Sequence, residues 1–370
     1  MTETPLIKDI KDIEKNIDLQ IKKDKINKTG DNFFDILHVV AHGTPLRTAI
    51  EKIARARTGG LIVISNDDAL KLIRGGFNIN VKFTTARAAE LSKMDGAVIL
   101  DKNVKRILYA ASLLVPSGAI KTNETGARHQ AAERTARQTG SSVIAVSQRT
   151  GTSTLYFGDQ KRWLKEIQEL FTRTRETLAS LERHRKALDE NILNLSIKEI
   201  AEVVKVRDVV AVLQRSEAIF RIEKLVQEYL TEMGKEGEFL EAQFKELVKD
   251  VEKDFAFVIK DYKNISVARV RKLLEELSQE HLLDLTHIMG TLGYASLDEK
   301  IYPRGYRFLN KVPSLSQDDV KLLVKKMGFK KLLNAGAFDF TVFKQLANKR
   351  TQIADEIKKL RENLILKIKN

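Results

Sequence analysis

The alternation of apolar and polar residues divides the chain into three zones. In the first zone, short runs rich in β-branched residues are bounded by turn residues and predict strands at 60–65, 96–101, 106–110 and 142–147. Apolar residues at helical spacing, behind a threonine in each case, predict helices at 44–57 and 84–94. Interleaved strands and helices predict a layered α/β domain over residues 31–158. The Lys- and Asp-rich residues 1–30 are expected to form a helical or frayed N-terminal extension.

The second zone, residues 159–300, is predicted to be helical. Between Gly158 and Gly290 there is no proline, and Gly234 and Gly237 are the only glycines, so residues that end helices are scarce. Apolar residues recur every three or four positions to about residue 285, which predicts a helical bundle or spacer. A continuous coiled coil is disfavoured because residues 194–204 and 233–239 interrupt the phase of that pattern.

The third zone, residues 301–370, predicts a compact helical domain. Ser316 is placed to cap a helix, with Asp319 as its capping-box partner and Gly328 closing the helix. Further helices are predicted at 341–347 and 351–369.

Charge changes the interpretation of this third zone. The chain has a net charge of +14, and residues 301–370 hold 16 Lys and Arg against 6 Asp and Glu. A solubilising tail is the plain alternative, but a tail lacks the apolar periodicity found here. We therefore expect a folded basic module whose partner carries a phosphate backbone.

Composition also indicates the cellular compartment in which the protein works. There is no cysteine, which excludes disulfides and thiolate metal sites and fits a reducing compartment. The first 20 residues lack the pattern of a secretory signal, and no apolar run approaches the ~18 residues of a membrane span. We expect a cytoplasmic protein that does not enter a membrane.

Two segments of the first zone carry candidate chemistry. Asp95 precedes a predicted strand and is followed by Gly96 and Ala97, small residues that let a ligand approach the backbone. A carboxylate there can bind Mg²⁺ or orient a hydroxyl nucleophile. The plain alternative is an ordinary Asp-Gly turn, which is the more common meaning of that pair by itself.

The second segment is TNETGARHQAAERTARQTG, residues 122–140. Thr125 or Gly126 is predicted to begin a helix, whose free N–H groups and positive dipole end favour phosphate. Arg128 and His129 add donors suited to phosphate oxygens. A surface helix with ordinary charges is the plain alternative.

The two segments stand in a wider pattern that resembles the diadenylate cyclase domain of the DNA-integrity scanning proteins. The similar segments of the first zone, in order, are GTPLR (43–47), RTGGLIVIS (57–65), GGF (75–77), KMDGAVIL (93–100), residues 114–140 and VIAVSQR (143–149). The resemblance continues in the spacer at residues 208–230 and in residues 304–335, which are similar to the family's helix-hairpin-helix domain. It covers nearly the whole chain.

The resemblance implies a fold and an activity. The fold would be a cyclase domain with a mixed sheet flanked by helices, then an all-α spacer and a helix-hairpin-helix domain at 301–370. Such proteins join two ATP molecules into cyclic di-AMP and release two pyrophosphates. Two cyclase domains meet face to face, so at least a dimer is implied, and the family assembles as a homo-octamer.

The resemblance also implies roles for residues. Asp95 would position or activate the attacking ribose hydroxyl through Mg²⁺ or Mn²⁺, and Arg128 and His129 would hold the triphosphate. The remaining ATP-binding positions would be Met94, Gly96, Ala97, Leu114, Gly126, Ala127, Gln130, Ala131 and Ser147.

The sequence departs from the family within this site. The usual Gly-Thr-Arg-His-Arg-Thr is here Gly126-Ala127-Arg128-His129-Gln130-Ala131, so two hydroxyls and one guanidinium are absent. Neutral hydrogen bonds contribute roughly 0.5–1.5 kcal/mol each and charged ones about 1.5–3 kcal/mol. Losing all three removes on the order of 3–6 kcal/mol if the contributions add. That predicts a rate reduced by roughly several hundredfold, short of complete loss.

The DNA end departs too. The family's Gly-x-Gly hairpin corresponds to LANKRTQIADEI, residues 346–357, which contains no glycine. Asn348 can replace one glycine, and Lys349 and Arg350, with Lys311, are the candidate DNA-binding cations. The alternative to an active cyclase that binds branched or damaged DNA is a weak or inactive paralogue acting as a DNA-binding scaffold or sensor.

Overall fold

A computed structural model describes residues 29–263, 265–327, 329 and 350–369. The chain forms two compact units, one of residues 1–174 with 227–240 and the other of residues 175–226 with 241–370. Gly328, Asn348, Lys349, residues 1–28 of the predicted N-terminal extension and the helix predicted at 341–347 lie outside the described residues. None of the helices in the described ranges is long and apolar enough to cross a membrane.

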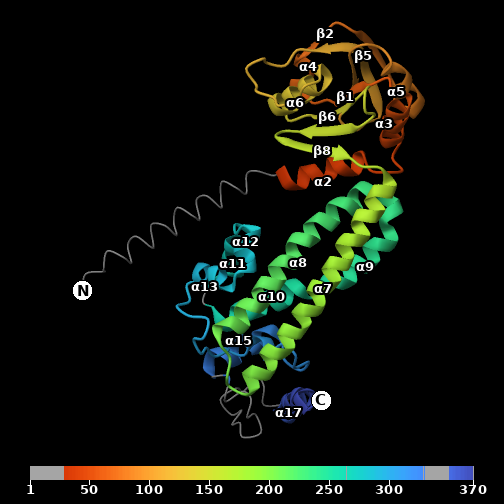
Figure 1. Cartoon of the computed structure of the whole chain (residues 1–370). Helices are drawn as coiled ribbons and strands as arrows, with labels where there is room; N and C mark the ends of the chain where they lie inside the picture. The colour runs from red at the N-terminus through yellow and green to blue at the C-terminus, as the bar shows by residue number, and fades with distance from the viewer. Residues whose placement is uncertain (1–28, 264, 328, 330–349, 370) are drawn as a thin grey trace. The chain divides into compact units, whose positions relative to one another are not determined.

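The first unit is built on one mixed sheet with helices on both faces (Figure 1). Its strands are β1 (Gly60–Ile64), β2 (Ile73–Arg74), β3 (Phe77–Lys82), β4 (Ala97–Leu100), β5 (Arg106–Leu114), β6 (Ser142–Val146), β7 (Ser153–Phe157) and β8 (Gln160–Leu164). Its helices are α2 (Thr29–Val39), α3 (Pro45–Ala56), α4 (Asp67–Lys71), α5 (Thr85–Leu91) and α6 (Ala127–Thr139). The sheet follows the order β2-β5-β4-β1-β6-β7-β8, and β3 also pairs with β5.

The predicted strands at the centre of this sheet are confirmed. β1 pairs with β4 in parallel and with β6 antiparallel, and these strands are apolar except for Ser142 because both faces of the sheet are covered. Residues 101–105 join β4 to the antiparallel β5, and β5 continues to Leu114, four residues past its predicted end. β8 lies beyond residue 158, where the sequence predicts the end of the α/β domain.

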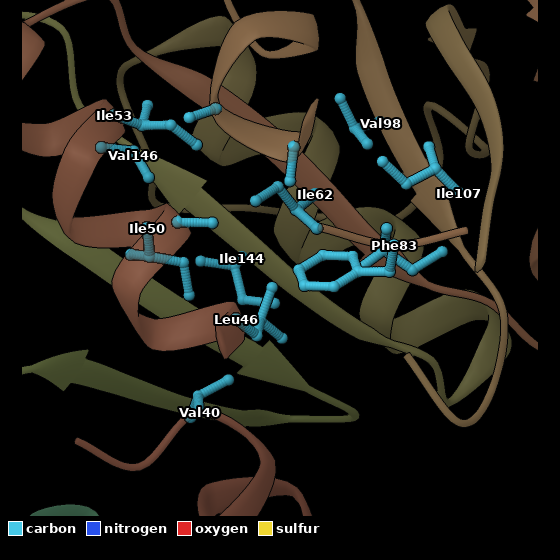
Figure 2. Packing of buried hydrophobic residues seen from close by; sticks show 14 of the residues in the cluster. Val40, Leu46, Ile50, Ile53, Ile62, Phe83, Val98, Ile107, Ile144 and Val146 are labelled. Atoms are coloured by element: carbon cyan, nitrogen blue, oxygen red, sulfur yellow. The ribbon is translucent and has the colours of Figure 1, made fainter. Parts of the chain in front are cut away.

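Alternate residues of the central strands form two cores. Ile62, Val98 and Ile144 point toward α3 and α5, and Figure 2 shows them packed with Ile50 and Ile53 of α3. The other core is formed against α4 and α6, where Ala132 and Ala136 let α6 approach the sheet closely. Each fully buried aliphatic side chain contributes roughly 1.5–3 kcal/mol of stability. These two cores fix the start of α6 against the strand ends, where the candidate site lies.

Buried charges tie residues 227–240 into the first unit. Glu232, fully buried, accepts a hydrogen bond from the backbone N–H of Lys165 at 2.6 Å and lies 3.3 Å from Arg162. The guanidinium of Arg47, from the GTPLR segment, lies 3.7 Å from the same carboxylate. Gly234 has a φ of +58°, and a Cβ there would lie 2.7 Å from the His42 carbonyl oxygen. Residues 227–240 are therefore an integral part of the first unit, although they follow its sheet by more than 60 residues in the sequence.

From residue 167 onward the described chain is helical, and this includes the whole described part of the second unit. The helices from residue 167 onward are α7 (Ile167–Ile200), α8 (Val206–Met233), η1 (Gly234–Gly237), α9 (Glu238–Val248), α10 (Val251–Tyr262), α11 (Val267–Glu275), α12 (Gln279–Leu283), α13 (Leu285–Thr291), α14 (Tyr306–Leu309), α15 (Gln317–Lys326) and α17 (Arg350–Lys369). The predicted breaks at 194–204 and 233–239 coincide with the end of α7 and with η1. The capping box of Ser316 and Asp319 is present at the start of α15.

A buried charge cluster holds α14 within the second unit. The Asp261 carboxylate accepts hydrogen bonds from the backbone N–H groups of residues 305, 306 and 307, at 2.8, 2.6 and 2.9 Å. Arg307 pairs with Glu199 of α7, and both side chains are almost fully buried. Burial raises the pKa of Asp261 to about 6, and the nearby Glu199 adds to this. These buried contacts join α7, α10 and α14.

Candidate active site

The two segments singled out in the sequence meet at one cavity of about 460 Å³ in the first unit. It lies at one end of the central strands, where β1 and β4 begin and β5 and β6 end, because Ala97 of β4 pairs with Ser112 of β5 and Gly60 of β1 pairs with Val146 of β6. The lining residues are Leu61, Asp95, Gly96, Ser112, Leu113, Leu114, Gly126, Ala127, Arg128, His129, Ala131, Val146, Ser147 and Gln148. Volumes of this size are typical of small-ligand sites.

Most of the nucleotide-binding residues expected from the sequence are on this lining, including Asp95, Gly96 and Ser147. Three are placed elsewhere. Met94 is exposed beside the cavity, and Ala97 is fully buried in the core of β4. The Gln130 amide turns away and donates a hydrogen bond to the Glu124 carbonyl oxygen at 2.8 Å.

Backbone conformation at the cavity floor depends on Gly96. Its φ is +106°, and a Cβ there would lie 2.6 Å from the carbonyl carbon of Ala111. Ala111 itself has a φ of +49°, which is rare for a residue with a side chain, at the point where the β4–β5 register shifts. This bulge directs Ser112 and Leu113 to the cavity, and neither is among the site residues expected from the sequence.

The Arg128 guanidinium packs directly against the backbone of Gly59, which leaves no room for a side chain at residue 59. A Cβ at Gly59, whose φ is +72°, would lie 2.6 Å from Nη1 and 3.2 Å from Cζ of the guanidinium. Nη2 lies 3.7 Å from Oδ1 of Asp95, whose side chain is fully exposed at the cavity. The glycine of the RTGG segment therefore makes room for the cation that faces the carboxylate.

His129 is held by a chain of side chains beneath α6. Its Nδ1 lies 2.9 Å from the hydroxyl oxygen of Tyr156, which donates to a Glu124 carboxylate oxygen at 2.9 Å. Lys161 donates to that same carboxylate oxygen. Burial raises the pKa of Glu124, but the bonds from Lys161 and Tyr156 outweigh it, so the net shift is downward. Glu124 is therefore ionised at neutral pH and can only accept.

This chain determines the tautomer of His129. Because Tyr156 gives its proton to the Glu124 carboxylate, its oxygen accepts from Nδ1–H of His129, which leaves Nε2 for a ligand. Burial lowers the pKa of His129, and the positive charges of Lys161 and Arg128 lower it further against the opposing effect of Glu124. Without a ligand the ring is neutral at pH 7, and an anion at Nε2 favours its protonation.

The helix start is confirmed as predicted. α6 begins at Ala127 with Gly126 as its N-cap, and no side chain of the described residues caps its free N–H groups. The loop before α6 is held by side chains from later in the same helix: Arg134 and Arg137 donate to the carbonyl oxygens of Ile120 and Lys121 at 2.9 and 2.8 Å. Exposed donors at a helix start are suited to phosphate oxygens.

The residues present fit a divalent cation held partly by the nucleotide. No cluster of three or more His, Asp or Glu side chains suited to a metal occurs in the described part of the chain. Asp95 is the one carboxylate lining the cavity among those residues. Mg²⁺ is commonly bound by one or two carboxylates together with substrate phosphates, so one exposed carboxylate facing a phosphate site is sufficient.

The candidate DNA-binding residues are only partly described. Lys311 is exposed just after α14, and its charge lies near the Asp254 carboxylate, whose pKa is raised by burial and lowered in part by Lys311. Arg350 is the first residue of α17. Of the segment 346–357 that corresponds to the family's hairpin, residues 346–349, with Lys349, lie outside the described residues, whereas 350–357 form the start of α17.

The chain is similar to proteins of known family. Residues 47–161 match the family described as DisA bacterial checkpoint controller nucleotide-binding, and residues 164–300 match the DisA bacterial checkpoint controller linker region. It is 39% identical to the DNA integrity scanning protein DisA of Acetivibrio thermocellus over 92% of this chain and 97% of that protein. The protein of the same name from Clostridium botulinum strain Loch Maree is 37% identical over 94% and 99%, and that of Bacillus licheniformis is 40% identical over 81% and 86%.

Proposed function

We propose a function on the premise that this chain belongs to the family of DNA integrity scanning proteins and is a diadenylate cyclase, a nucleotidyltransferase. In the proposed reaction two cyclase domains, each with one ATP, meet face to face. Each ribose 3′-oxygen loses its proton and attacks the α-phosphorus of the other ATP. The bond from that phosphorus to the bridging oxygen breaks, so two pyrophosphates leave and cyclic di-AMP forms.

One observation carries this proposal. Asp95 and the Arg128-His129 pair, about 30 residues apart in the sequence, line the same cavity. Phosphoryl transfer depends on positioning and on neutralising charge at the phosphorus, and these three groups supply both. Leu113 and Leu114 add an apolar surface suited to a base, with Leu113 largely exposed.

Each side chain has a proposed role. Asp95 holds Mg²⁺ or Mn²⁺, which when bound supplies a Lewis acid at the phosphate oxygens. Arg128 binds the triphosphate through its fork of N–H donors, and His129 donates to it from Nε2 in its protonated form. The free N–H groups at the start of α6 receive the remaining phosphate charge.

The three residues that differ from the family's usual pattern, Ala127, Gln130 and Ala131, do not all face the cavity. Ala127 and Ala131 line the cavity, so the hydroxyls they lack are lost from the site itself. Gln130 faces Glu124 instead, so the absent guanidinium does not reduce the charge lining this cavity. We expect a loss of about 1–3 kcal/mol from two neutral hydrogen bonds, which lowers the rate by roughly 5- to 150-fold.

The C-terminal residues are proposed to bind DNA without reading its sequence. The excess of cations in residues 301–370 supports this, and the absence of glycine at 346–357 shifts the expected contacts from backbone N–H groups to side-chain cations. Shortening the chain at residue 300 is expected to abolish salt-sensitive binding to a DNA junction. Undiminished binding of the shortened chain would assign the DNA site elsewhere.

The reaction can be tested with 3′-deoxy-ATP, which keeps the triphosphate and lacks the nucleophile. An equal mixture of ATP and 3′-deoxy-ATP is expected to give a linear dinucleotide besides cyclic di-AMP, because only one of the two bonds can form. Chromatography resolves the two products. The absence of both, in a protein that binds 3′-deoxy-ATP, would support the alternative of an inactive DNA-binding scaffold.

A further inference from the structure

The second unit contains its own cavity, of about 400 Å³, with no part in the proposed reaction. It lies among the end of α10, the segment before α11, the start of α14 and the start of α15. The lining residues are Phe257, Lys260, Lys263, Ile265, Ser266, Arg304, Tyr306, Asn310, Gln317, Val320 and Lys321. These include four cations and, within the described part of the chain, no carboxylate.

The position of two of these cations has a local explanation. Lys260 lies in the last turn of α10 and Lys263 is its C-cap, where the helix dipole favours positive charge. Arg304 and Lys321 come from other segments, before α14 and within α15, and that explanation does not extend to them. Three segments distant in sequence therefore bring like charges to one cavity, which costs free energy unless an anion is present.

Two of these four cations, both at the end of α10, lie against aromatic rings. The ammonium groups of Lys260 and Lys263 lie over the rings of Phe257 and Tyr294, at 5.5 and 3.5 Å from the ring centres. Neither forms an ion pair with a carboxylate of the described residues, whereas Lys321 pairs with Asp318 at 2.9 Å. Burial lowers the pKa of Lys263, opposed by the negative charge of Glu299.

Neutral donors complete the lining. Ser266, Tyr306, Asn310 and Gln317 supply hydroxyl and amide groups beside the cations. Cations together with neutral donors, in the absence of acceptor-only side chains, are the groups that bind phosphate oxygens. Phe257 and Tyr306 add aromatic surface of the kind on which a base can stack.

We propose that this cavity binds a phosphate group, carried either by the DNA backbone or by a free nucleotide. No described residue of the segment 346–357 lines it. Its DNA form rests on the DNA binding proposed above, whereas its nucleotide form does not. The two lysines at the end of α10 supply most of the charge that faces the phosphate, and Arg304 on the lining adds a further positive charge.

The test is acylation of lysines in the full chain by an amine-reactive ester, read residue by residue by peptide mass spectrometry. Inorganic tripolyphosphate represents the free ligand and a DNA junction represents the backbone. We expect either ligand to slow modification of Lys260 and Lys263 severalfold, with Lys300 and Lys325, exposed cations outside the cavity, as internal references. Protection by only one of the two identifies the source of the phosphate.

A pair of variants gives the corresponding affinity. Lys263→Gln with Arg304→Gln is expected to weaken binding of the protecting ligand at least fivefold, and Lys300→Gln with Lys325→Gln, which removes equal charge, to weaken it less than twofold. Equal effects in the two variants, or no protection by either ligand, would overturn the proposal. If the unaltered chain does not bind DNA, the DNA function fails, and the tripolyphosphate measurement still decides this inference.

Discussion

The two cavities use positive charge in different ways. In the first unit each cation has a fixed position: Arg128 lies against Gly59 and faces Asp95, and His129 is hydrogen-bonded to Tyr156. In the second unit Lys260 and Lys263 lie over aromatic rings and have no carboxylate partner among the described residues. Both cavities are suited to phosphate, but only the first holds its donors at fixed positions beside a carboxylate.

The difference corresponds to what each site requires. A reaction needs its groups held within fractions of an ångström, because only interactions stronger in the transition state raise the rate. Binding an anion needs mainly charge, and flexible lysines supply it. Changes that shift a group without removing it should therefore impair the first cavity far more than the second.

Among changes that shift a group without removing it, the largest effect is expected from Gly59→Ala. The new methyl group would lie 2.6 Å from Nη1 of Arg128, so the guanidinium must shift. Loss of one charged hydrogen bond to the triphosphate costs about 1.5–3 kcal/mol, a decrease in turnover of roughly 10- to 150-fold. Gly140→Ala is the matched control, because Gly140 has a φ of +67° with nothing within 4 Å of a Cβ. Equal losses in the two variants would show that backbone strain, not the position of Arg128, is responsible.

A smaller effect is expected from Tyr156→Phe, which removes the acceptor for Nδ1–H of His129. One neutral hydrogen bond corresponds to roughly 0.5–1.5 kcal/mol, so ATP affinity should fall about two- to tenfold. Equilibrium binding of 3′-deoxy-ATP measures this without turnover.

The pH dependence of the same binding gives a second test of this chain. Because burial lowers the pKa of His129 and phosphate binding requires the protonated ring, affinity should rise as the pH falls through and below 6.5, the ordinary value. His129→Gln is expected to lose this dependence, and Tyr156→Phe to shift it to lower pH. Protonation of 3′-deoxy-ATP itself is common to all three proteins and cancels in the comparison. An unchanged profile for His129→Gln would show that this histidine does not contact phosphate.

The smallest effect is a gain. Ala127→Thr and Ala131→Thr each place a hydroxyl on the cavity lining, and each is expected to raise turnover about two- to tenfold. Restoring Gln130→Arg as well should raise it further only slightly, because residue 130 lies outside the lining. If Gln130→Arg raises turnover more than the two threonine substitutions do, residue 130 contacts the nucleotide held by the facing cyclase domain, and our account of this position is wrong.

Much of the first unit follows from sequence patterns. The central strands are continuous apolar runs, and the Gly-Ala start of α6 lies where the phosphate-binding pattern predicts it. The pair β7 and β8 was missed, although STLYF and QKRWL flank a Gly-Asp turn typical of a hairpin. That omission also concealed Tyr156, which reaches His129 only because β7 pairs with β6 beneath α6.

Other features of the site had no signal in the sequence. The positive φ of Ala111 and the register shift beside it depend on how β4 and β5 pair, and they bring Ser112 and Leu113 to the cavity. The contact between Gly59 and Arg128 joins residues almost 70 positions apart and follows from tertiary packing alone. In the second unit the four cations of the cavity lie scattered among ordinary helix charges, and only the packing of three segments brings them together.

The most direct test of the central claim is the rate at which the full chain converts ATP with Mn²⁺ or Mg²⁺ into cyclic di-AMP. We predict measurable synthesis by the unaltered protein, a loss of roughly 100-fold or more in Asp95→Asn, and little change in Asp68→Asn, an exposed carboxylate of α4 outside the cavity. Synthesis by Asp95→Asn at the rate of the unaltered protein, or no product from either, would contradict the assignment of this cavity as the site of reaction.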